Sequence, residues 1–174
     1  GDQDQDRGWE TIDITYGTWV DSSYKDEDGD STNFGIHLPN PHFIVRPATG
    51  QIGVHEWPLD ATVTLAVDDP ATPEVDYNTS GIVGLSHWNP HETFLEFDVS
   101  QEIDIQPGFI VTLDDGSLQK SLTVTYLEIT GVDLDGDMVY GTADPNSNLR
   151  VRVHECSDLD ILADGDGNWA ADFS

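Results

Sequence analysis

The chain has 174 residues, and 34 Asp and Glu against six Lys and Arg give it a formal net charge of −28. So few cations exclude a basic patch of the kind that binds nucleic acid or an anionic membrane surface. No stretch approaches the roughly 20 apolar residues that a membrane-spanning helix needs. A content of 37% hydrophobic residues, including five Trp, still predicts a packed core in one domain or two small ones.

Alternation of apolar and polar residues with period two predicts β-strands along most of the chain, and no segment has helical periodicity over three turns. Turn pairs such as Pro107-Gly108 and Asp135-Gly136 separate the runs. The predicted strands cover residues 11–16, 61–67, 93–99, 109–113, 122–127, 138–140 and 149–153. The fold class is therefore predicted to be all-β, with two antiparallel β-sandwich modules.

The spacing of these strands divides the chain into three parts. Residues 1–32 are expected to form an acidic arm with one strand at about residues 10–20 that lacks a hairpin partner close in sequence. Residues 33–127 hold enough strands for one complete sandwich, and residues 128–174 form a short module of about five strands. A full immunoglobulin-type sandwich takes about 100 residues, so the short module is expected to be incomplete on its own. The strand of the arm could complement it within the chain or in another copy.

The last module carries four segments with a recognisable pattern, at residues 129–132, 139–147, 149–153 and 163–169. They read as a strand, a turn at Asp144-Pro145-Asn146, a strand, and a hairpin before Trp169. In this pattern the module resembles a bacterial immunoglobulin-like repeat of extracellular adhesins. The resemblance covers about a quarter of the chain. It implies an immunoglobulin-like β fold in a cell-surface protein and says nothing of catalysis.

Acidic or amide residues recur at every second position in four runs, a spacing that lets alternate oxygens converge where a Gly bends the chain. Ca²⁺ takes six to eight oxygen ligands from flexible loops, so the runs are candidate calcium sites, although none has the spacing of an EF-hand. Acidic hairpin turns and salt adaptation explain the same pattern and stay open. The candidate ligands are Asp26, Asp28, Asp30, Asp133, Asp135, Asp137, Asp144, Asp164, Asp166 and Asn168, with a fourth run at Asp2, Asp4 and Asp6.

Other candidate sites rest on weaker patterns. Trp9, Trp57 and Trp88 lie in or beside predicted turns, where they could form platforms for sugar rings, although core packing is the commoner use of Trp. Asn78 begins an N-glycosylation tripeptide in an expected loop. The spacing of His87 and His91 does not favour a zinc site, because a predicted loop separates them and no cysteine pair lies near. No nucleophile elbow, zinc-protease or phosphate-loop motif is present, so we do not expect an enzyme.

These observations together predict an extracellular or cell-surface structural repeat, a subunit of a fibre, filament or stalk. Its partners would be copies of itself, joined head to tail, with calcium stiffening the array. A carbohydrate-binding or adhesin module and a salt-adapted domain of unrelated function are the alternatives. A chain that begins with Gly1 is expected to be a processed or excised piece, and whether it is a whole protein or one unit of a tandem array stays open.

Overall fold

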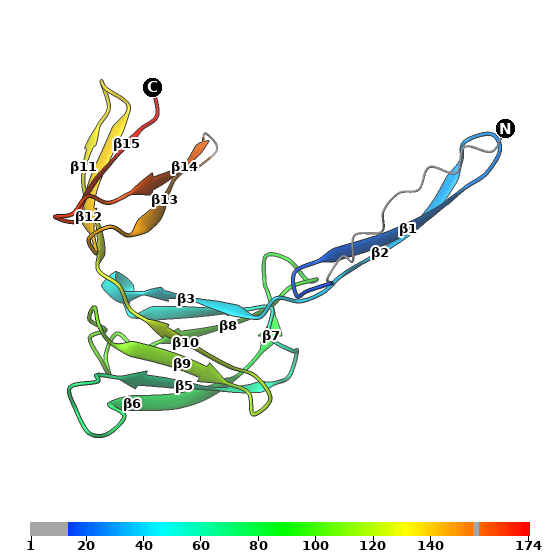
Figure 1. Ribbon diagram of the computed structural model, residues 1–174. Helices are drawn as coiled ribbons and strands as arrows, with labels where there is room; N and C mark the ends of the chain where they lie inside the picture. The colour runs from blue at the N-terminus through cyan, green and yellow to red at the C-terminus, as the bar shows by residue number, and fades with distance from the viewer. Residues whose placement is uncertain (1–13, 155–156) are drawn as a thin grey trace.

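The computed structural model describes residues 14–154 and 157–174. These residues form fifteen β-strands and one short 3-10 helix, Pro47–Thr49, and every strand pairing is antiparallel. The prediction of an all-β fold is confirmed. Figure 1 shows three parts: an N-terminal hairpin, a central sandwich and a C-terminal module, the hairpin projecting from the opposite end of the sandwich to that module.

The N-terminal hairpin consists of β1 (Trp19–Lys25) and β2 (Ser31–His37), joined by a turn at residues 26–30. β1 pairs with β2 along its whole length, from Trp19 opposite His37 to Lys25 opposite Ser31. The predicted lone strand at residues 10–20 is therefore wrong in its described part. Residues 14–18 form a turn, the strand begins at Trp19, and its partner follows directly. The hairpin also crosses the expected boundary between residues 32 and 33.

Two four-stranded sheets form the central sandwich (Figure 1). The first has the order β3-β4-β8-β7, with bounds His42–Arg46, Gln51–His55, Thr93–Asp98 and Gly84–Leu85. The second has the order β10-β9-β5-β6, with bounds Gln119–Thr123, Ile110–Asp114, Thr62–Asp68 and Tyr77–Ile82.

The core of the sandwich follows from the alternation in the sequence. In β5, Val63, Leu65 and Val67 point inward and are fully buried, while the residues between them are exposed or half-buried. Val111 and Leu113 of β9 and Ile52 and Val54 of β4 complete the same cluster. Period two therefore directs one side chain in two toward the opposite sheet, as expected for a sandwich.

The C-terminal module places three strands against two. Its larger sheet has the order β11-β12-β15, with bounds Leu127–Asp133, Met138–Ala143 and Asn168–Asp172, and its smaller sheet pairs β13 (Asn148–Val153) with β14 (Ser157–Leu162). Three buried residues form its core, Ala143, Ala163 and Trp169, with partly buried side chains around them. This core is much smaller than that of the sandwich, so the module has less apolar burial to stabilise it.

Candidate assembly and binding sites

One face of the β1–β2 hairpin is apolar and uncovered. Antiparallel partners share a face, and the register places Val20 opposite Ile36 and both beside Tyr24 and Phe34. Their exposed fractions are 41% for Val20, 51% for Ile36, 71% for Tyr24 and 73% for Phe34. The other face carries mainly polar residues, with Trp19 at its base. Such an alternation is typical of a strand pair that buries one face, yet no described residue covers this one.

The base of the hairpin continues its own ladder and meets the sandwich at Asn40. The Gly17 amide donates to the Leu38 carbonyl at 2.8 Å, and the Leu38 amide donates to the Thr18 carbonyl at 2.9 Å, which extends the β1–β2 pairing by one residue pair. The Asn40 amide donates to the Glu56 carboxylate at 2.8 Å, between Pro39 and Pro41. Proline fixes the backbone φ angle, so these contacts limit the swing of the hairpin relative to the body.

Three acidic residues meet at the tip of the hairpin. One carboxylate oxygen each from Asp26, Asp28 and Asp30 lies within 4.8 Å of the others, and all three residues are exposed. Asp26 accepts the amides of Gly29 and Asp30 at 3.0 and 2.9 Å. The pKa of Asp26 lies below its usual value, first because of a hydrogen bond with the Asp28 carboxyl and further because of these amides. A cation bound here would complete its ligands with water or with another molecule.

The other acidic runs do not converge in this way. Within residues 14–154 and 157–174, no second group of three or more His, Cys, Asp or Glu brings its ligand atoms so close. In the β11–β12 turn, the Asp133 carboxylate accepts the amides of Asp135 and Gly136, and Asp137 follows the same turn. The structure separates Asp144 from this run, because the whole of β12 lies between them.

The run from Asp164 to Asn168 forms a hairpin turn, with Asp144 in a neighbouring turn. The Asn146 amide donates to the Asp164 carbonyl at 3.1 Å. The Asp164 carboxylate accepts the amides of Asn168 and Asp166 at 2.8 and 2.9 Å, and these bonds, led by that of Asn168, lower its pKa. The Asp164 carboxylate therefore has hydrogen-bond partners within its own turn. The run Asp2, Asp4 and Asp6 lies outside the described residues.

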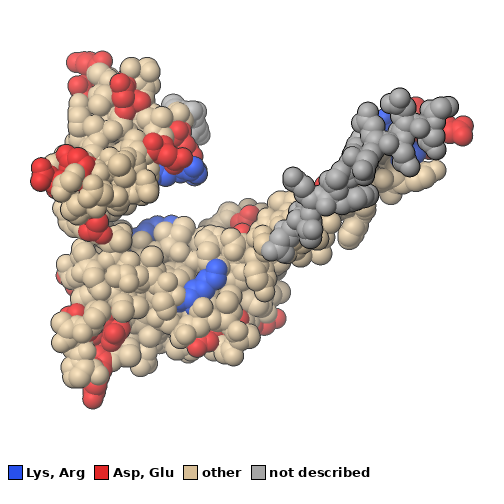
Figure 2. All heavy atoms as spheres, in the orientation of Figure 1, with Lys and Arg blue, Asp and Glu red and all other residues tan. Residues whose placement is uncertain are grey.

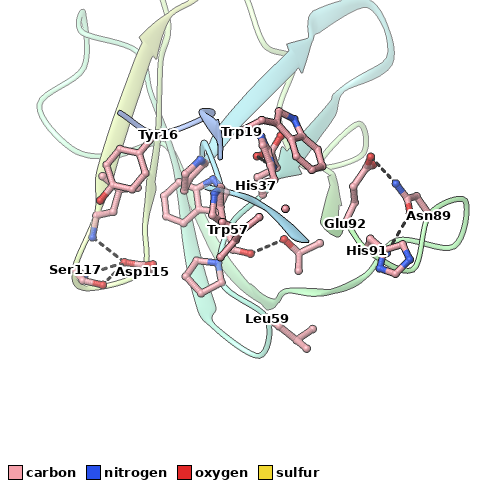
Figure 3. Close-up of a pocket in the computed structure, with 18 residues that line it drawn as sticks. Tyr16, Trp19, His37, Trp57, Leu59, Asn89, His91, Glu92, Asp115 and Ser117 are labelled. Atoms are coloured by element: carbon pink, nitrogen blue, oxygen red, sulfur yellow. Dashed lines mark hydrogen bonds and ion pairs between the residues drawn. The ribbon is translucent and has the colours of Figure 1, made fainter. Parts of the chain in front are cut away.

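A cleft of about 1020 Å³ lies between the base of the hairpin and the end of the sandwich (Figure 3). Tyr16, Trp19 and His37 line it from the hairpin, and Glu56 and Trp57 line it from the sandwich. The Trp19 ring lies 4.8 Å from the His37 ring, and His37 Nδ1 lies 3.8 Å from the Glu56 carboxylate. The cleft thus combines aromatic rings with a carboxylate and an imidazole.

Trp57 does not form a stacking platform, because only 1% of its surface is exposed. Its ring packs in the core of the sandwich, and its buried indole Nε1 has no hydrogen-bond partner among the described residues. Trp88 is half exposed, and its indole donates to Glu92 at 3.1 Å. Trp9 lies outside the described residues. The exposed aromatic rings of the cleft are instead Trp19 and Tyr16, which the sequence analysis did not single out.

His42 and His55 are two histidines whose rings stack, and this contact was not predicted from the sequence. They are directly opposite in the β3–β4 pair, and their rings stack at 5.0 Å. The pKa of His55 is lowered, first by burial and then by the nearby His42 and Arg46. The signal was available, since residues 47–50 form a turn that places the flanking residues opposite one another.

Asn78 lies in β6 and is exposed, so its tripeptide is part of an edge strand and the expected loop is wrong.

The side of the molecule shown in Figure 2 carries scattered acidic side chains over the sandwich and the C-terminal module, with Lys and Arg in a few isolated places. No helix in the described part of the chain is long and apolar enough to cross a membrane.

No protein-family model matches the sequence, and no curated protein is significantly similar to it. The likeness of residues 128–174 to bacterial immunoglobulin-like repeats therefore stays a prediction.

Proposed function

We propose that the chain is an extracellular structural module that joins copies of itself head to tail into a surface fibre or stalk. The observation that carries this proposal is the uncovered apolar face of the β1–β2 hairpin, with Phe34 and Tyr24 more than two thirds exposed. A two-stranded hairpin is marginally stable in water by itself, so this face favours a partner. A hairpin that projects from the sandwich is suited to reach a second molecule.

The energetics show what the partner must supply. Burial of the exposed parts of Val20, Tyr24, Phe34 and Ile36 is worth roughly 5 kcal/mol at the usual value for apolar side chains. Association costs at least about 4 kcal/mol in lost freedom of motion. The partner must therefore bring an apolar surface or free strand edge of its own.

We also propose that Ca²⁺ binds at the hairpin tip. Asp26, Asp28 and Asp30 support this, because hard oxygen ligands from an exposed loop are what Ca²⁺ prefers. The ion would neutralise part of the charge at the leading end of the hairpin and so lower its repulsion from another acidic copy.

The assembly proposal is tested with Phe34→Glu in the full 174-residue chain. The wild type should form larger species as its concentration rises in sedimentation velocity, and filaments should appear in electron micrographs. Phe34→Glu should remain monomeric, because it places a charge on the apolar face. Ser23→Glu, on the polar face of the same hairpin, should assemble as the wild type does. A wild type that stays monomeric at high concentration, with and without Ca²⁺, would contradict the proposal.

A second candidate function is the binding of neutral glycans in the cleft of Figure 3. It is favoured by the exposed rings of Trp19 and Tyr16 beside Glu56 and His37. Aromatic faces pack against sugar rings, and polar groups hydrogen-bond their hydroxyls. Trp19→Ala should abolish binding to a glycan array, and Trp88→Ala, which does not line the cleft, should retain it. Absence of any bound glycan would rule this candidate out.

A further inference from the structure

We infer that the hairpin docks on the uncovered inner face of β11 in the C-terminal module of a second copy. The inference rests on the proposed function and names the acceptor surface that the function requires. The acceptor consists of Leu127, Ile129 and Val132, called here the β11 row.

The β11 row faces the core side of its sheet. The register places Leu127 opposite Ala143, Ile129 opposite Gly141, and Val132 opposite Val139. Ala143 and Gly141 are buried, and Val139 is half-buried against the core of the module. Directly opposite residues project to the same side of a sheet, so the β11 row belongs to this inner face. Its three residues are nevertheless exposed, at 60%, 62% and 60%.

The row is uncovered because the facing sheet has only two strands. β14 contacts β15, and β13 is the next strand of the smaller sheet. β11 lies at the end of the larger sheet opposite to β15, the strand that β14 contacts. The edge of β13 that faces away from β14 pairs with no strand in the described part of the chain. The module is thus a sandwich with one side of its second layer missing.

The hairpin of a second copy could supply the strands that are missing from the smaller sheet of the module. It supplies two further strands, an apolar face to lie on the β11 row, and outer edges that pair with no strand among the described residues and can therefore pair with β13. Strand addition of this kind gains main-chain hydrogen bonds as well as apolar burial. The seven exposed apolar side chains of the two surfaces together amount to roughly 800 Å², and a specific interface needs about 1,000 Å² or more, so the pairing with the β13 edge must supply the remaining area.

Charge also favours this pairing. The protein carries a net charge of −28, so most surfaces of two copies repel each other. The apolar face of the hairpin contains Ser22 and Thr32 besides its four large side chains, and no charged residue. The inner face of β11 is uncharged as well. Two uncharged apolar surfaces on so acidic a protein can meet without bringing like charges together.

The acceptor belongs to another copy because the hairpin points away from its own C-terminal module (Figure 1). Where the hairpin meets the sandwich, the Asn40 amide donates to the Glu56 carboxylate at 2.8 Å, and His37 Nδ1 lies 3.8 Å from the same carboxylate. The hairpin of one molecule and the β11 row of the next are different surfaces, so the contact is heterologous. A heterologous contact that does not close into a ring extends into a filament.

The test uses two charge variants of the full chain, Phe34→Glu in the hairpin and Ile129→Glu in the β11 row. Both side chains are mostly exposed, so both variants should fold, which circular dichroism and thermal melting verify. Each variant alone should fail to assemble, with affinity lowered about a hundredfold or more by a charge without a partner in the contact. Mixed in equal amounts, they should form a one-to-one dimer and nothing longer. In that dimer the Ile129→Glu variant supplies its unchanged hairpin, and the Phe34→Glu variant supplies its unchanged β11 row. Tyr140→Glu, on the outer face of the same sheet, is the matched control and should assemble normally.

The outcomes separate the two proposals. If Phe34→Glu stays monomeric while Ile129→Glu forms filaments, the hairpin assembles elsewhere and only the acceptor is wrong. If Ile129→Glu alone forms dimers, the hairpins pair with each other, which also overturns the acceptor. If the wild type never assembles, the proposed function fails with it.

Discussion

His55 lies half-buried between the rings of His42 and Phe94, each about 5 Å away, and its Nε2 has no hydrogen-bond partner among the described residues. Burial disfavours the charged imidazole, and His42 and Arg46 add positive charge nearby. The folded protein therefore holds the pKa of His55 below its usual value of about 6.5.

The sign of the resulting pH dependence follows from linkage. Between the lower pKa of His55 in the folded protein and its ordinary pKa in the unfolded chain, the unfolded chain binds the imidazole proton more readily. The free energy of unfolding therefore rises with pH in this range. We expect the melting temperature to fall as the pH drops from 7 through 6.5 toward the folded-state pKa. His55→Gln should flatten this slope, measured by thermal melting in buffers of constant ionic strength. His91→Gln, at an exposed position, should leave it unchanged. An equal slope in all three proteins would show that His55 does not control it.

At the scale of the element, the hairpin tip shows why spacing alone could not identify the acidic sites. All four runs share the same alternation, but strand backbone places alternate side chains on one face without bringing them together. Convergence at Asp26, Asp28 and Asp30 requires the tight turn through Gly29, which has a φ of 104°. In the run at Asp164, hydrogen bonds to the turn amides occupy the leading carboxylate instead.

Calcium at the tip predicts a specific loss of stability on chelation. An ion that binds the folded state alone stabilises it by mass action, so excess chelator should lower the melting temperature at constant ionic strength. Asp28→Asn should remove this response, and Asp135→Asn should retain it, because its run does not converge. Restoration of the melting temperature by Na⁺ alone would favour general screening over a site.

The strand pairings show a second limit at this scale. Period two located β5, β8 and β9 of the sandwich, because burial on one face requires it, whereas β3, β4, β6 and β7 were not predicted. It could not show that β1 pairs with β2, since residues 26–30 read equally well as a metal loop and as a hairpin turn. The acidic composition of residues 26–30 favoured the interpretation as a metal loop. In the structure these residues form the hairpin turn, and three of their carboxylates lie close together as well.

At the scale of the whole molecule, the net charge opposes the assembly that the apolar surfaces favour. Repulsion between acidic copies is screened within about 10 Å at 0.1 M salt and within about 3 Å at 1 M. Apolar contacts do not weaken with added salt. We therefore expect assembly to increase from 0.1 M to 1 M NaCl, measured by sedimentation velocity. Assembly that weakens over this range would show that ion pairs hold the copies together.

Assembly would also complete the weakest part of the fold. The C-terminal module buries only Ala143, Ala163 and Trp169 as core residues, whereas the sandwich buries thirteen. A docked hairpin would cover the β11 row and extend the smaller sheet, so the incomplete module gains the layer that it lacks. The 47 residues from 128 to 174 are fewer than half of the roughly 100 that a full immunoglobulin-type sandwich takes, so the chain there is too short for two full sheets.

The sequence by itself determined the all-β class, because the period-two alternation that marks a strand is a local property of each segment. Only the tertiary structure decided that Trp57 is buried, that His42 stacks on His55, and that Asp26, Asp28 and Asp30 converge while the runs at Asp133 and Asp164 do not. It also decided that the hairpin face and the β11 row are both uncovered. Each of these depends on which strands lie side by side and how far a sheet extends. Alternation along one strand specifies which side chains share a face and leaves open what covers that face.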